Sequence, residues 1–364
     1  MKTLNVAVIG CGRIAGHHCR NIVSIEGLKL SAVCDLDIEK AKVYSNEFHV
    51  PAFANYHEMF AKHPEIDVVA IITPSGMHYE HAKEVISRYK KNVIVEKPTF
   101  LKLSHLQEIY ELAASNSLEV FPVFQNRYNR AVQRVKTALN NQELGKINIF
   151  SVRVRWCRSQ KYYDLSPWRG TFAMDGGALT NQGVHHVDLL RYLGGEVEEV
   201  YSVMGTFGAE IEVEDTCVAA LKFANGAVGT LEITTSARPN DFEASISVVG
   251  SKGLAQIGGI AVNELQVLTT DSDAIKTESE DFSSCVYGNG HKELYKDLVA
   301  HFNKLKSYPV TKQDALGTMS LLQSFYVSHE KGIKVKPSDK AESRRLGEDN
   351  DKLANLYRTN MERA

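Results

Sequence analysis

A short apolar segment followed by a glycine-rich turn constrains the fold of this chain more than any other stretch. Leu4–Ile9 is typical of a buried strand, and the sequence after it, GCGRIAG, leads into a helical pattern. In this G-x-G-x-x-A spacing, Gly10 allows a tight turn, Gly12 lets the backbone approach a pyrophosphate, and Ala15 allows a helix to pack closely on the strand. The stretch predicts the first βαβ unit of a dinucleotide-binding domain.

Asp35 indicates which dinucleotide this domain binds. Leu28–Cys34 reads as the second strand, and Asp35 follows it at the position where a carboxylate accepts hydrogen bonds from the ribose hydroxyls of NAD. A 2′-phosphate would be repelled there, which favours NAD over NADP, although a guanidinium at Arg13 could accept a phosphate. Asp35 could instead cap the next helix, but Asp37 stands directly before the periodic run Ile38–Phe48 and is the better cap.

Strands and helices continue to alternate through the first third of the chain. Strands are expected at Val68–Ile72, Asn92–Lys97 and Glu119–Phe124, with a helix across about Met77–Lys90. A further helix is expected to start at Ser104-His105-Leu106-Gln107, which has the form of a capping box. Strand alternating with helix predicts an α/β fold with a doubly wound parallel sheet.

The segment Asn92–Pro98, NVIVEKP, places a lysine at the end of one of these strands. Pro98 cannot donate a hydrogen bond to a neighbouring strand, so the strand is expected to end with Lys97 at its tip. Parallel sheets bind ligands beyond the carboxyl ends of their strands. The amine of Lys97 is therefore expected to point into the ligand-binding crevice.

From Ile147 the pattern changes to strands joined by short turns. The expected strands are Ile147–Trp156, Val197–Phe207, Thr216–Phe223, Ala227–Thr235, Phe242–Val249 and Glu264–Thr269. Turn signals such as Asn225-Gly226 and Ser251-Lys252-Gly253 predict a large, mostly antiparallel open sheet. The helices expected around it are Asn129–Asn141, Val184–Leu193, His291–Leu305 and Gln313–Lys331, the last introduced by a T-x-x-D cap at Thr311–Asp314.

Length and pattern together predict two domains and a tail. An NAD-binding Rossmann domain is expected over residues 1–123 and an α+β domain for substrate binding and oligomerisation over residues 124–331. Residues 332–364 form a charged tail with a short helix near Asp349–Tyr357, which could dock on a neighbour or fray.

Composition argues against several classes of protein. The chain has 42 basic and 44 acidic residues, interspersed, for a net charge of −2, so neither nucleic acid nor a membrane surface is an expected partner. The absence of a signal-like or membrane-spanning apolar run leads to the expectation of a cytoplasmic protein. The six cysteines lie scattered without a C-x-x-C pair, which argues against structural zinc or a disulfide framework and indicates small core residues in a reducing compartment.

The stretch Met174–Gly195 contains the second set of candidate reactive groups. His185 and Asp188 are three residues apart on one helical face, and a histidine at a helix start is a candidate acid or base. His186 sits about 100° further round the helix, so one of the two histidines is expected to be structural. A metal held by His185, Asp188 and Asp175 is the competing use, but no dense ligand motif supports it and no metal is predicted.

Four motifs in order along the chain are GCGRIAG, TPSGMH at Thr73–His78, EKP at Glu96–Pro98, and GGALTNQGVHHVDLL in the second half. Together they resemble the Gfo/Idh/MocA family of NAD(P)-dependent oxidoreductases. The resemblance implies that Lys97 and His185 lie at the nicotinamide. The family commonly has an aspartate where this chain has Asn181, which can orient a hydroxyl but cannot relay its proton. The acid/base role then falls more heavily on Lys97 and His185.

Further motifs, FQNRYN, SQKYYD and PWRGT among them, resemble the UDP-N-acetylglucosaminuronate 3-dehydrogenases within this family. A physical counterpart is a set of five arginines close together in sequence, whose guanidinium forks suit diphosphates and carboxylates: Arg127, Arg153, Arg155, Arg158 and Arg169. For any one of them a solvated sheet face is at least as good an explanation, since Arg153 and Arg155 alternate with valines. For the set, contact with an anionic substrate is favoured.

These observations define the predicted site. The predicted catalytic residues are Lys97, His185 and Asn181. The predicted cofactor site, for NAD, comprises Gly10, Gly12, Arg13, Ile14, Asp35, Thr73, Pro74, Ser75, His78, Glu96, Lys97 and Gln125. The predicted substrate-binding residues are Arg127, Tyr128, Arg155, Arg158, Tyr163, Trp168, Arg169, Asn181 and His185.

The predicted function is NAD-dependent oxidation of the C3 hydroxyl of a UDP-linked N-acetyl uronic acid to a ketone. The alternatives are a related dehydrogenase or ketoreductase for another sugar, polyol or inositol, and a non-catalytic dinucleotide-binding regulator. The last is less favoured because both Lys97 and His185 are present. The resemblance also implies a homo-oligomer, with a tetramer favoured over a dimer.

Overall fold

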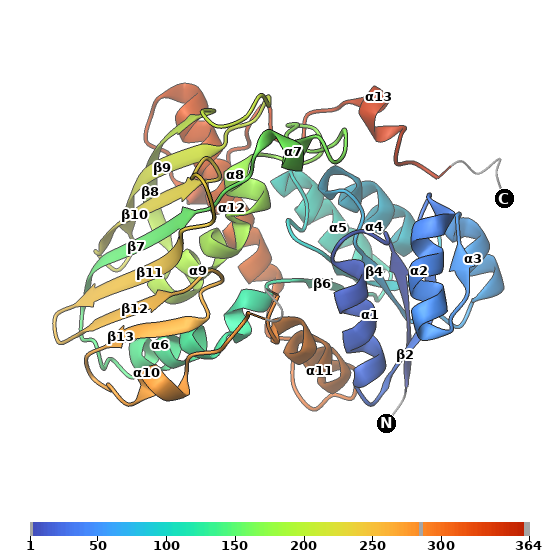
Figure 1. The fold of residues 1–364 in the computed structure, drawn as a ribbon, viewed down its shortest axis with the longest axis horizontal. Helices are drawn as coiled ribbons and strands as arrows, with labels where there is room; N and C mark the ends of the chain where they lie inside the picture. Colours follow the sequence, from blue (N-terminus) through green and yellow to red (C-terminus); the bar gives the residue numbers. More distant parts are fainter. Residues whose placement is uncertain (1–2, 284–286, 360–364) are drawn as a thin grey trace. The chain divides into compact units, whose positions relative to one another are not determined.

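The structure is a computed structural model that describes residues 3–283 and 287–359. Cys285 lies outside the described residues. The chain forms two compact units (Figure 1). Unit 1 comprises the described parts of Met1–Val123 and Asp349–Ala364 together with His291–Ala315. Unit 2 comprises the described part of Phe124–Gly290 together with Leu316–Glu348.

Unit 1 is built on a six-stranded sheet in which every neighbouring pair is parallel. The strand order is β3-β2-β1-β4-β5-β6, so the order reverses between β1 and β4. The strands are β1 (Leu4–Ile9), β2 (Leu28–Cys34), β3 (Ala52–Phe53), β4 (Val68–Ile71), β5 (Asn92–Val95) and β6 (Val120–Pro122). The predicted doubly wound α/β sheet is confirmed, with β3 as an additional short edge strand.

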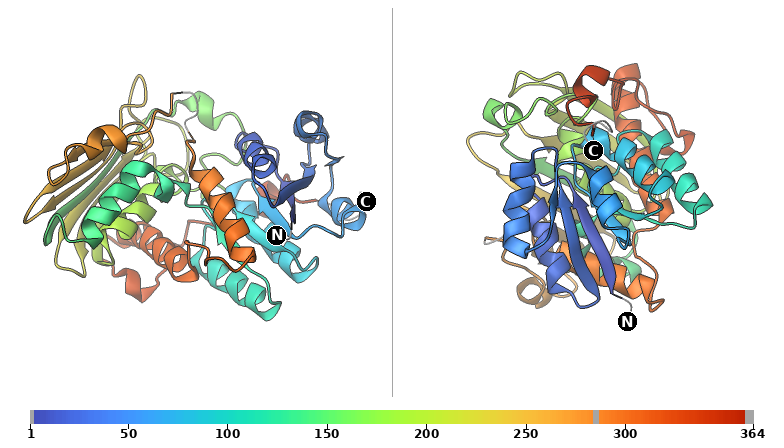
Figure 2. Two further views of the ribbon diagram at one scale, coloured as in Figure 1. Left: turned by 90° about the horizontal axis from the view of Figure 1, so that it is seen from below. Right: turned by 90° about the vertical axis from the view of Figure 1, so that its right-hand side faces the viewer.

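Helices lie on both faces of this sheet (Figure 2). The helical elements of unit 1 are α1 (Ala15–Ser24), α2 (Ile38–Phe48), α3 (Tyr56–Lys62), α4 (His78–Ser87), α5 (Leu103–Ser115), α11 (Gly290–Phe302), α13 (Asp351–Ala354) and the 3-10 turn η1 (Ser75–Met77). The Asp37 side chain accepts from the Glu39 N–H at 3.1 Å, which confirms the predicted cap of α2. The predicted capping box at Ser104 is wrong, because α5 already begins at Leu103 and Lys102 is its N-cap residue.

Two segments from the C-terminal part of the chain belong to unit 1, whereas the sequence pattern placed them in the second domain and the tail. The Tyr308 hydroxyl donates to the Pro122 carbonyl at 2.9 Å. The Arg358 guanidinium donates twice to the Glu80 carboxylate, at 2.8 and 2.6 Å. These contacts join segments that are distant in sequence, so a division by sequence position alone does not find them.

Unit 2 contains a seven-stranded sheet in the order β13-β12-β11-β7-β10-β9-β8. All neighbours are antiparallel except β7 and β10, which are parallel. The strands are β7 (Ile147–Arg155), β8 (Val197–Gly205), β9 (Thr216–Phe223), β10 (Val228–Thr234), β11 (Glu243–Gly250), β12 (Leu254–Gly258) and β13 (Glu264–Leu268). Burial alternates along β8 and β9, so one face of the sheet packs on helices and the other is exposed (Figure 2).

The remaining elements are helical. They are η2 (Gln125–Tyr128), α6 (Arg130–Asn140), α7 (Gln160–Tyr163), α8 (Ala178–Asn181), α9 (Val184–Gly194), α10 (Ala274–Thr277), α12 (Lys312–Lys331) and η3 (Pro337–Asp339). The Thr311 hydroxyl donates to the Asp314 carboxylate at 2.7 Å and accepts from the Asp314 N–H at 3.1 Å, which confirms the predicted cap of α12. No helix of the described residues is long and apolar enough to cross a membrane.

Several buried histidines stay neutral in the folded protein. His186 on α9 lies edge-on to the Trp156 ring, with 5.8 Å between ring centroids. Burial lowers the pKa of His186 from 6.5 to about 4, and it lowers the pKa of His81 on α4 to about 4 as well. His186 is therefore a packing residue, which fits the expectation that one histidine of the His185–His186 pair is structural.

Replacing His186 with phenylalanine should reduce the acid sensitivity of the fold. The folded-state pKa lies below the unfolded value, so the contribution of His186 to stability is full above about pH 6.5 and is lost as the pH falls. Between about pH 7.5 and about pH 5.5 the wild type should lose about 1 kcal/mol more unfolding free energy than the variant. Urea denaturation at the two pH values measures this difference, and equal losses in both proteins would contradict it.

Candidate active site

The turn between β1 and α1 has the geometry that a dinucleotide pyrophosphate requires. Gly10 has φ +98°, and a Cβ there would lie 2.5 Å from the Ile72 carbonyl oxygen. A Cβ on Gly12 would meet no heavy atom within 4 Å, so the backbone is open on that side. Buried Ala15 begins α1, and exposed Arg13 and half-buried Ile14 precede it. These residues fit the cofactor fingerprint.

Asp35 lies half-buried at the end of β2, next to this turn. Its Oδ2 accepts the Cys11 N–H at 2.7 Å, and its Oδ1 accepts the Asp37 N–H at 2.9 Å. The two hydrogen bonds fix the direction of the carboxylate, and each oxygen keeps a second lone pair for a ribose hydroxyl. The residues therefore fit NAD, whose reactive ring supplies hydride acceptance when it is bound.

The segment Thr73–His78 follows β4 and is tied into unit 1. The His78 Nδ1 and Nε2 lie 2.9 Å from the Pro98 and Thr73 carbonyl oxygens respectively, and the Thr73 hydroxyl lies 3.0 Å from His81 Nδ1. His78 thus joins the turn after β4 to the segment after β5. Pro74 is the N-cap residue of η1, and Ser75 is buried at its start. The side chain of His78 points into the protein interior.

Lys97 lies beyond the end of β5 instead of at its last position. The strand ends at Val95, and the Glu96 N–H still donates to the Ile71 carbonyl at 3.1 Å. Lys97 is half-buried, and its peptide bond to Pro98 is cis. The predicted strand end at Lys97 is therefore two residues too late.

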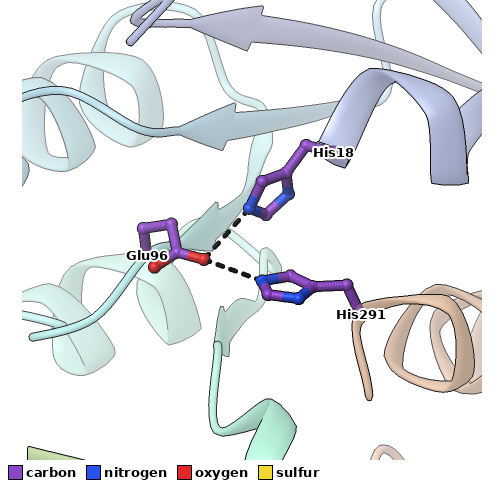
Figure 3. Close-up of side chains that lie close together, drawn as sticks. All are labelled: His18, Glu96 and His291. Atoms are coloured by element: carbon purple, nitrogen blue, oxygen red, sulfur yellow. Dashed lines mark hydrogen bonds and ion pairs between the residues drawn. The ribbon is translucent and has the colours of Figure 1, made fainter. Parts of the chain in front are cut away.

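The Glu96 carboxylate is 6% exposed and is directed at two histidines (Figure 3). His18 Nε2 and His291 Nε2 lie 3.0 and 3.1 Å from Glu96 Oε1. Burial opposes ionisation, but hydrogen bonds from both imidazoles outweigh it and hold the pKa of Glu96 well below its usual range. Glu96, predicted among the cofactor residues, is thus engaged inside unit 1. Sequence reasoning did not find His18 or His291, because neither stands in a local motif.

In unit 2, α8 and α9 hold two of the predicted catalytic residues. Asn181 and His185 are each 8% exposed. The Asn181 amide donates to Asp175 Oδ1, and Asp175 Oδ2 accepts the Gly170 N–H at 2.8 Å. The Gln125 amide donates to His185 Nε2 at 3.0 Å, so the ring proton of His185 lies on Nδ1. Gln125 is thus placed against His185.

Asp188, predicted to share a helical face with His185, is used elsewhere. Arg127 donates to both oxygens of Asp188, at 2.7 and 2.6 Å, and the Thr318 hydroxyl donates at 2.9 Å. Arg127 is buried and stacks over Tyr192 at 4.6 Å from the ring centroid. Arg127, predicted to bind substrate, is therefore part of a buried ion pair.

The arginines of the sequence cluster fall into two groups. Arg155 on β7 pairs with Glu232 at 2.6 Å, and Arg158 pairs with Asp241 at 2.8 Å. For Arg155 and Arg158 these partners favour the explanation as surface ion pairs over substrate contact. The Arg153 side chain is 3.6 Å from Glu243.

Arg169 forms the second group by itself. No carboxylate of the described ranges 3–283 and 287–359 lies within ion-pair distance of it. Its guanidinium stacks over Tyr162 and Trp168, at 4.4 and 4.6 Å from the ring centroids, and donates to the Tyr162 hydroxyl at 2.5 Å. The same hydroxyl accepts from Gln182, the residue after Asn181, at 3.2 Å. Tyr163 is buried and Tyr128 is half-buried. Arg169 is thus a cation held by aromatic rings beside α8.

A buried acid beneath α8 was not found from the sequence. Glu214 accepts from the Leu179 N–H at 3.1 Å and from the Tyr326 hydroxyl at 2.8 Å, while its Oε2 has no partner. A Cβ on Gly177 would lie 2.0 Å from the Glu214 carboxyl carbon, so glycine is required there. Burial raises the pKa of Glu214 to about 7. The double glycine was the available signal, but it does not identify the group that approaches.

The turn, the sheet and Asp35 define an NAD-binding domain, and comparison with known proteins gives the family and its oxidoreductase class. Residues 4–124 match the oxidoreductase family, NAD-binding Rossmann fold, and residues 132–256 match the GFO/IDH/MocA C-terminal domain. The chain belongs to the Gfo/Idh/MocA family of NAD-dependent dehydrogenases.

Individual relatives differ in substrate. The chain is 32% identical to the WlbA dehydrogenase from Bordetella pertussis, solved in complex with NADH and UDP-GlcNAcA, with a TM-score of 0.86 over 92% of this chain and 98% of that one. It is 26% identical to myo-inositol 2-dehydrogenase of Thermotoga maritima over 93% of this chain and 99% of that protein. It is 25% identical to the uncharacterised oxidoreductase YrbE of Bacillus subtilis over 86% of this chain and 91% of that protein.

Alanine at Gly12 and at Gly10 should separate cofactor binding from folding. Gly12→Ala adds a methyl group in open space, so thermal stability should stay near that of the wild type while NAD affinity falls on the order of tenfold or more. Gly10→Ala meets the Ile72 carbonyl at a positive φ and should lower the melting temperature as well. Thermal unfolding gives the melting temperature of each variant, and titration gives its NAD affinity. Wild-type NAD affinity in Gly12→Ala would contradict the prediction.

Proposed function

We propose that this dehydrogenase oxidises the C3 hydroxyl of a UDP-linked N-acetyl uronic acid to a ketone. The observation that carries the proposal is the similarity, at 32% identity over nearly the full length, to a dehydrogenase solved with NADH and UDP-GlcNAcA. Such a substrate carries a diphosphate and a carboxylate, so it needs cationic recognition.

Arg169 supports an anionic substrate. The other four arginines of the sequence cluster have carboxylate partners, whereas in the part of the chain that the structure describes Arg169 has none. A guanidinium held by Tyr162 and Trp168 keeps its charge available to a ligand. We assign Arg169 to the anionic part of the substrate, with Tyr163 and Trp168 as further wall residues.

The proposed proton transfer uses the chain's own groups. Lys97 takes the proton from the substrate hydroxyl, and His185 is the second acid/base group. Gln125 orients the His185 ring by donating to its Nε2. Asn181, whose amide is fixed by Asp175, orients the hydroxyl without taking its proton.

A spectroscopic titration tests the substrate class. Purified protein with NAD⁺ should show a rise in reduced-nicotinamide absorbance when UDP-N-acetylglucosaminuronate is added, and no rise with neutral polyols. The second candidate is an inositol or polyol dehydrogenase, favoured by the similarity to myo-inositol 2-dehydrogenase. A rise with myo-inositol and none with the UDP-sugar would replace the first proposal with the second.

Lys97→Met should retain NAD binding and lose on the order of 10²–10⁴-fold in turnover, because it removes the proposed base. The matched control is Lys83→Met on α4, whose amine pairs with Glu108 on the surface and which should keep wild-type turnover. Stopped-flow measurement of NADH formation gives the rate. Unchanged turnover in Lys97→Met would remove Lys97 from the mechanism.

Arg169→Gln should raise the KM for the UDP-sugar on the order of tenfold or more, because one charge-assisted contact is lost. Arg153→Gln is the control, since Arg153 is exposed and its guanidinium lies near Glu243. Steady-state kinetics with both variants give the KM for the UDP-sugar. Equal KM values for Arg169→Gln and the wild type would contradict a substrate contact.

A further inference from the structure

Glu96 collects three hydrogen bonds from three different parts of unit 1. Oε1 accepts from His18 Nε2 on α1 and from His291 Nε2 on α11 (Figure 3). Oε2 accepts the backbone N–H of Lys97 at 2.9 Å. The dinucleotide-binding helix α1, helix α11 and the residue proposed as base therefore meet at one carboxylate.

Several buried histidines surround Glu96. The Tyr295 hydroxyl lies 2.8 Å from His18 Nδ1, and His18 Nε2 lies 3.0 Å from Glu96 Oε1. His291 Nδ1 has no partner among the described residues, and burial lowers the pKa of His291. Of the other titratable groups nearby, burial lowers the pKa of His17 to about 4 and also lowers that of His78. Glu96, whose pKa is lowered, thus lies among imidazoles of which burial lowers the pKa of His17, His78 and His291.

Such a carboxylate is a rigid support. A buried carboxylate keeps its charge only while hydrogen-bond donors surround it. Moving any one donor away leaves part of the charge without a partner, which costs free energy. Because Lys97 N–H is one of these donors, the backbone of Lys97 is fixed relative to α1 and α11. Glu96 directly precedes Lys97 in the sequence, and a negative charge near an amine favours its protonated form.

We propose that Glu96 is a positioning residue that acts through Lys97. Its carboxylate, held by His18 and His291, fixes the backbone from which the lysine side chain extends. The inference rests on the proposed role of Lys97 as the base.

A metal is the other use for this cluster. The ligand atoms of His18, Glu96 and His291 lie within 4.8 Å of one another. However, Glu96 Oε1 already accepts a hydrogen bond from each imidazole, and the two distances, 3.0 and 3.1 Å, are ordinary hydrogen-bond lengths. The hydrogen-bonded arrangement is therefore favoured, and bound metal is an outcome of the test.

Glu96→Gln tests the proposal. The amide keeps the shape but removes the charge, and it places a donor against either Lys97 N–H or the imidazoles. The expected result is a fall in kcat of about tenfold or more, with the KM for NAD changed by less than about threefold. The control is Glu119→Gln, which removes a carboxylate from an exposed pair with His301 on the same helix α11 and should leave kcat unchanged.

Two further readouts separate positioning from a general loss of structure. The pH midpoint of kcat/KM should move to lower pH by about half a unit or more in Glu96→Gln, because loss of the charge eases deprotonation of the base. In the Lys97→Met background, Glu96→Gln should cause no further loss of rate. An unmoved midpoint, an additive loss in the double variant, or stoichiometric zinc that Glu96→Gln abolishes would each overturn the proposal.

The outcome is distinguishable from failure of the proposed function. An active Lys97→Met variant would overturn the role of Lys97, whereas an inactive Lys97→Met with a fully active Glu96→Gln would overturn only the positioning role. If Glu96→Gln does not fold, His291→Gln and His291→Leu replace it. The glutamine can still donate to Glu96 and should keep at least half of kcat, and the leucine should lower kcat by about tenfold. Equal rates in the two variants would overturn the proposal.

Discussion

Buried carboxylates impose the strictest condition on both units of this protein, because each must be surrounded by donors or lose its charge. Glu96 and Asp188 meet the condition with donors: two imidazoles and a backbone N–H for Glu96, and a guanidinium and a hydroxyl for Asp188. Glu214 instead loses part of its charge. One of its oxygens has no partner, and burial raises its pKa to about 7, so near neutral pH it exchanges its proton instead of being held as an anion. In each unit, backbone N–H groups are held by these acids: the Lys97 N–H by Glu96 and the Leu179 N–H by Glu214.

Prediction from sequence succeeded where the physical cause is local. The bounds of β1, β2 and α2 follow from apolar runs, a glycine turn and the Asp37 cap, all decided by residues a few positions apart. It failed where the cause is a distant partner. Asp188 is bound to a residue 61 positions away and Glu96 to one 195 positions away, so no periodicity could show that the first is an ion-pair acid or that the second turns inward.

The arginine cluster shows the same limit of prediction from sequence, because the partners that neutralise each arginine are distant in the chain. A run of cations in sequence indicates an anion site, but it does not say which cations the protein itself neutralises. Strand pairing answers that for Arg155, since β7 lies beside β10, and Glu232, two positions before the residue opposite Arg155, accepts from its guanidinium. Arg169 lies outside the sheet and is surrounded by aromatic rings instead. Sheet register, which a single sequence does not reveal, thus decides which arginine keeps its charge for a ligand.

Because α11 packs in unit 1, the order of synthesis also limits the order in which the two units can complete their folding. A ribosome releases the six strands of the first sheet early, but His291 follows only after all seven strands of the second sheet have emerged. Until then, neither the His291 imidazole that binds Glu96 nor the Tyr308 hydroxyl that binds Pro122 is available. All strands of the unit 2 sheet are therefore synthesised before the last segments that pack in unit 1. The part of the chain that is made first is therefore the part that is finished last.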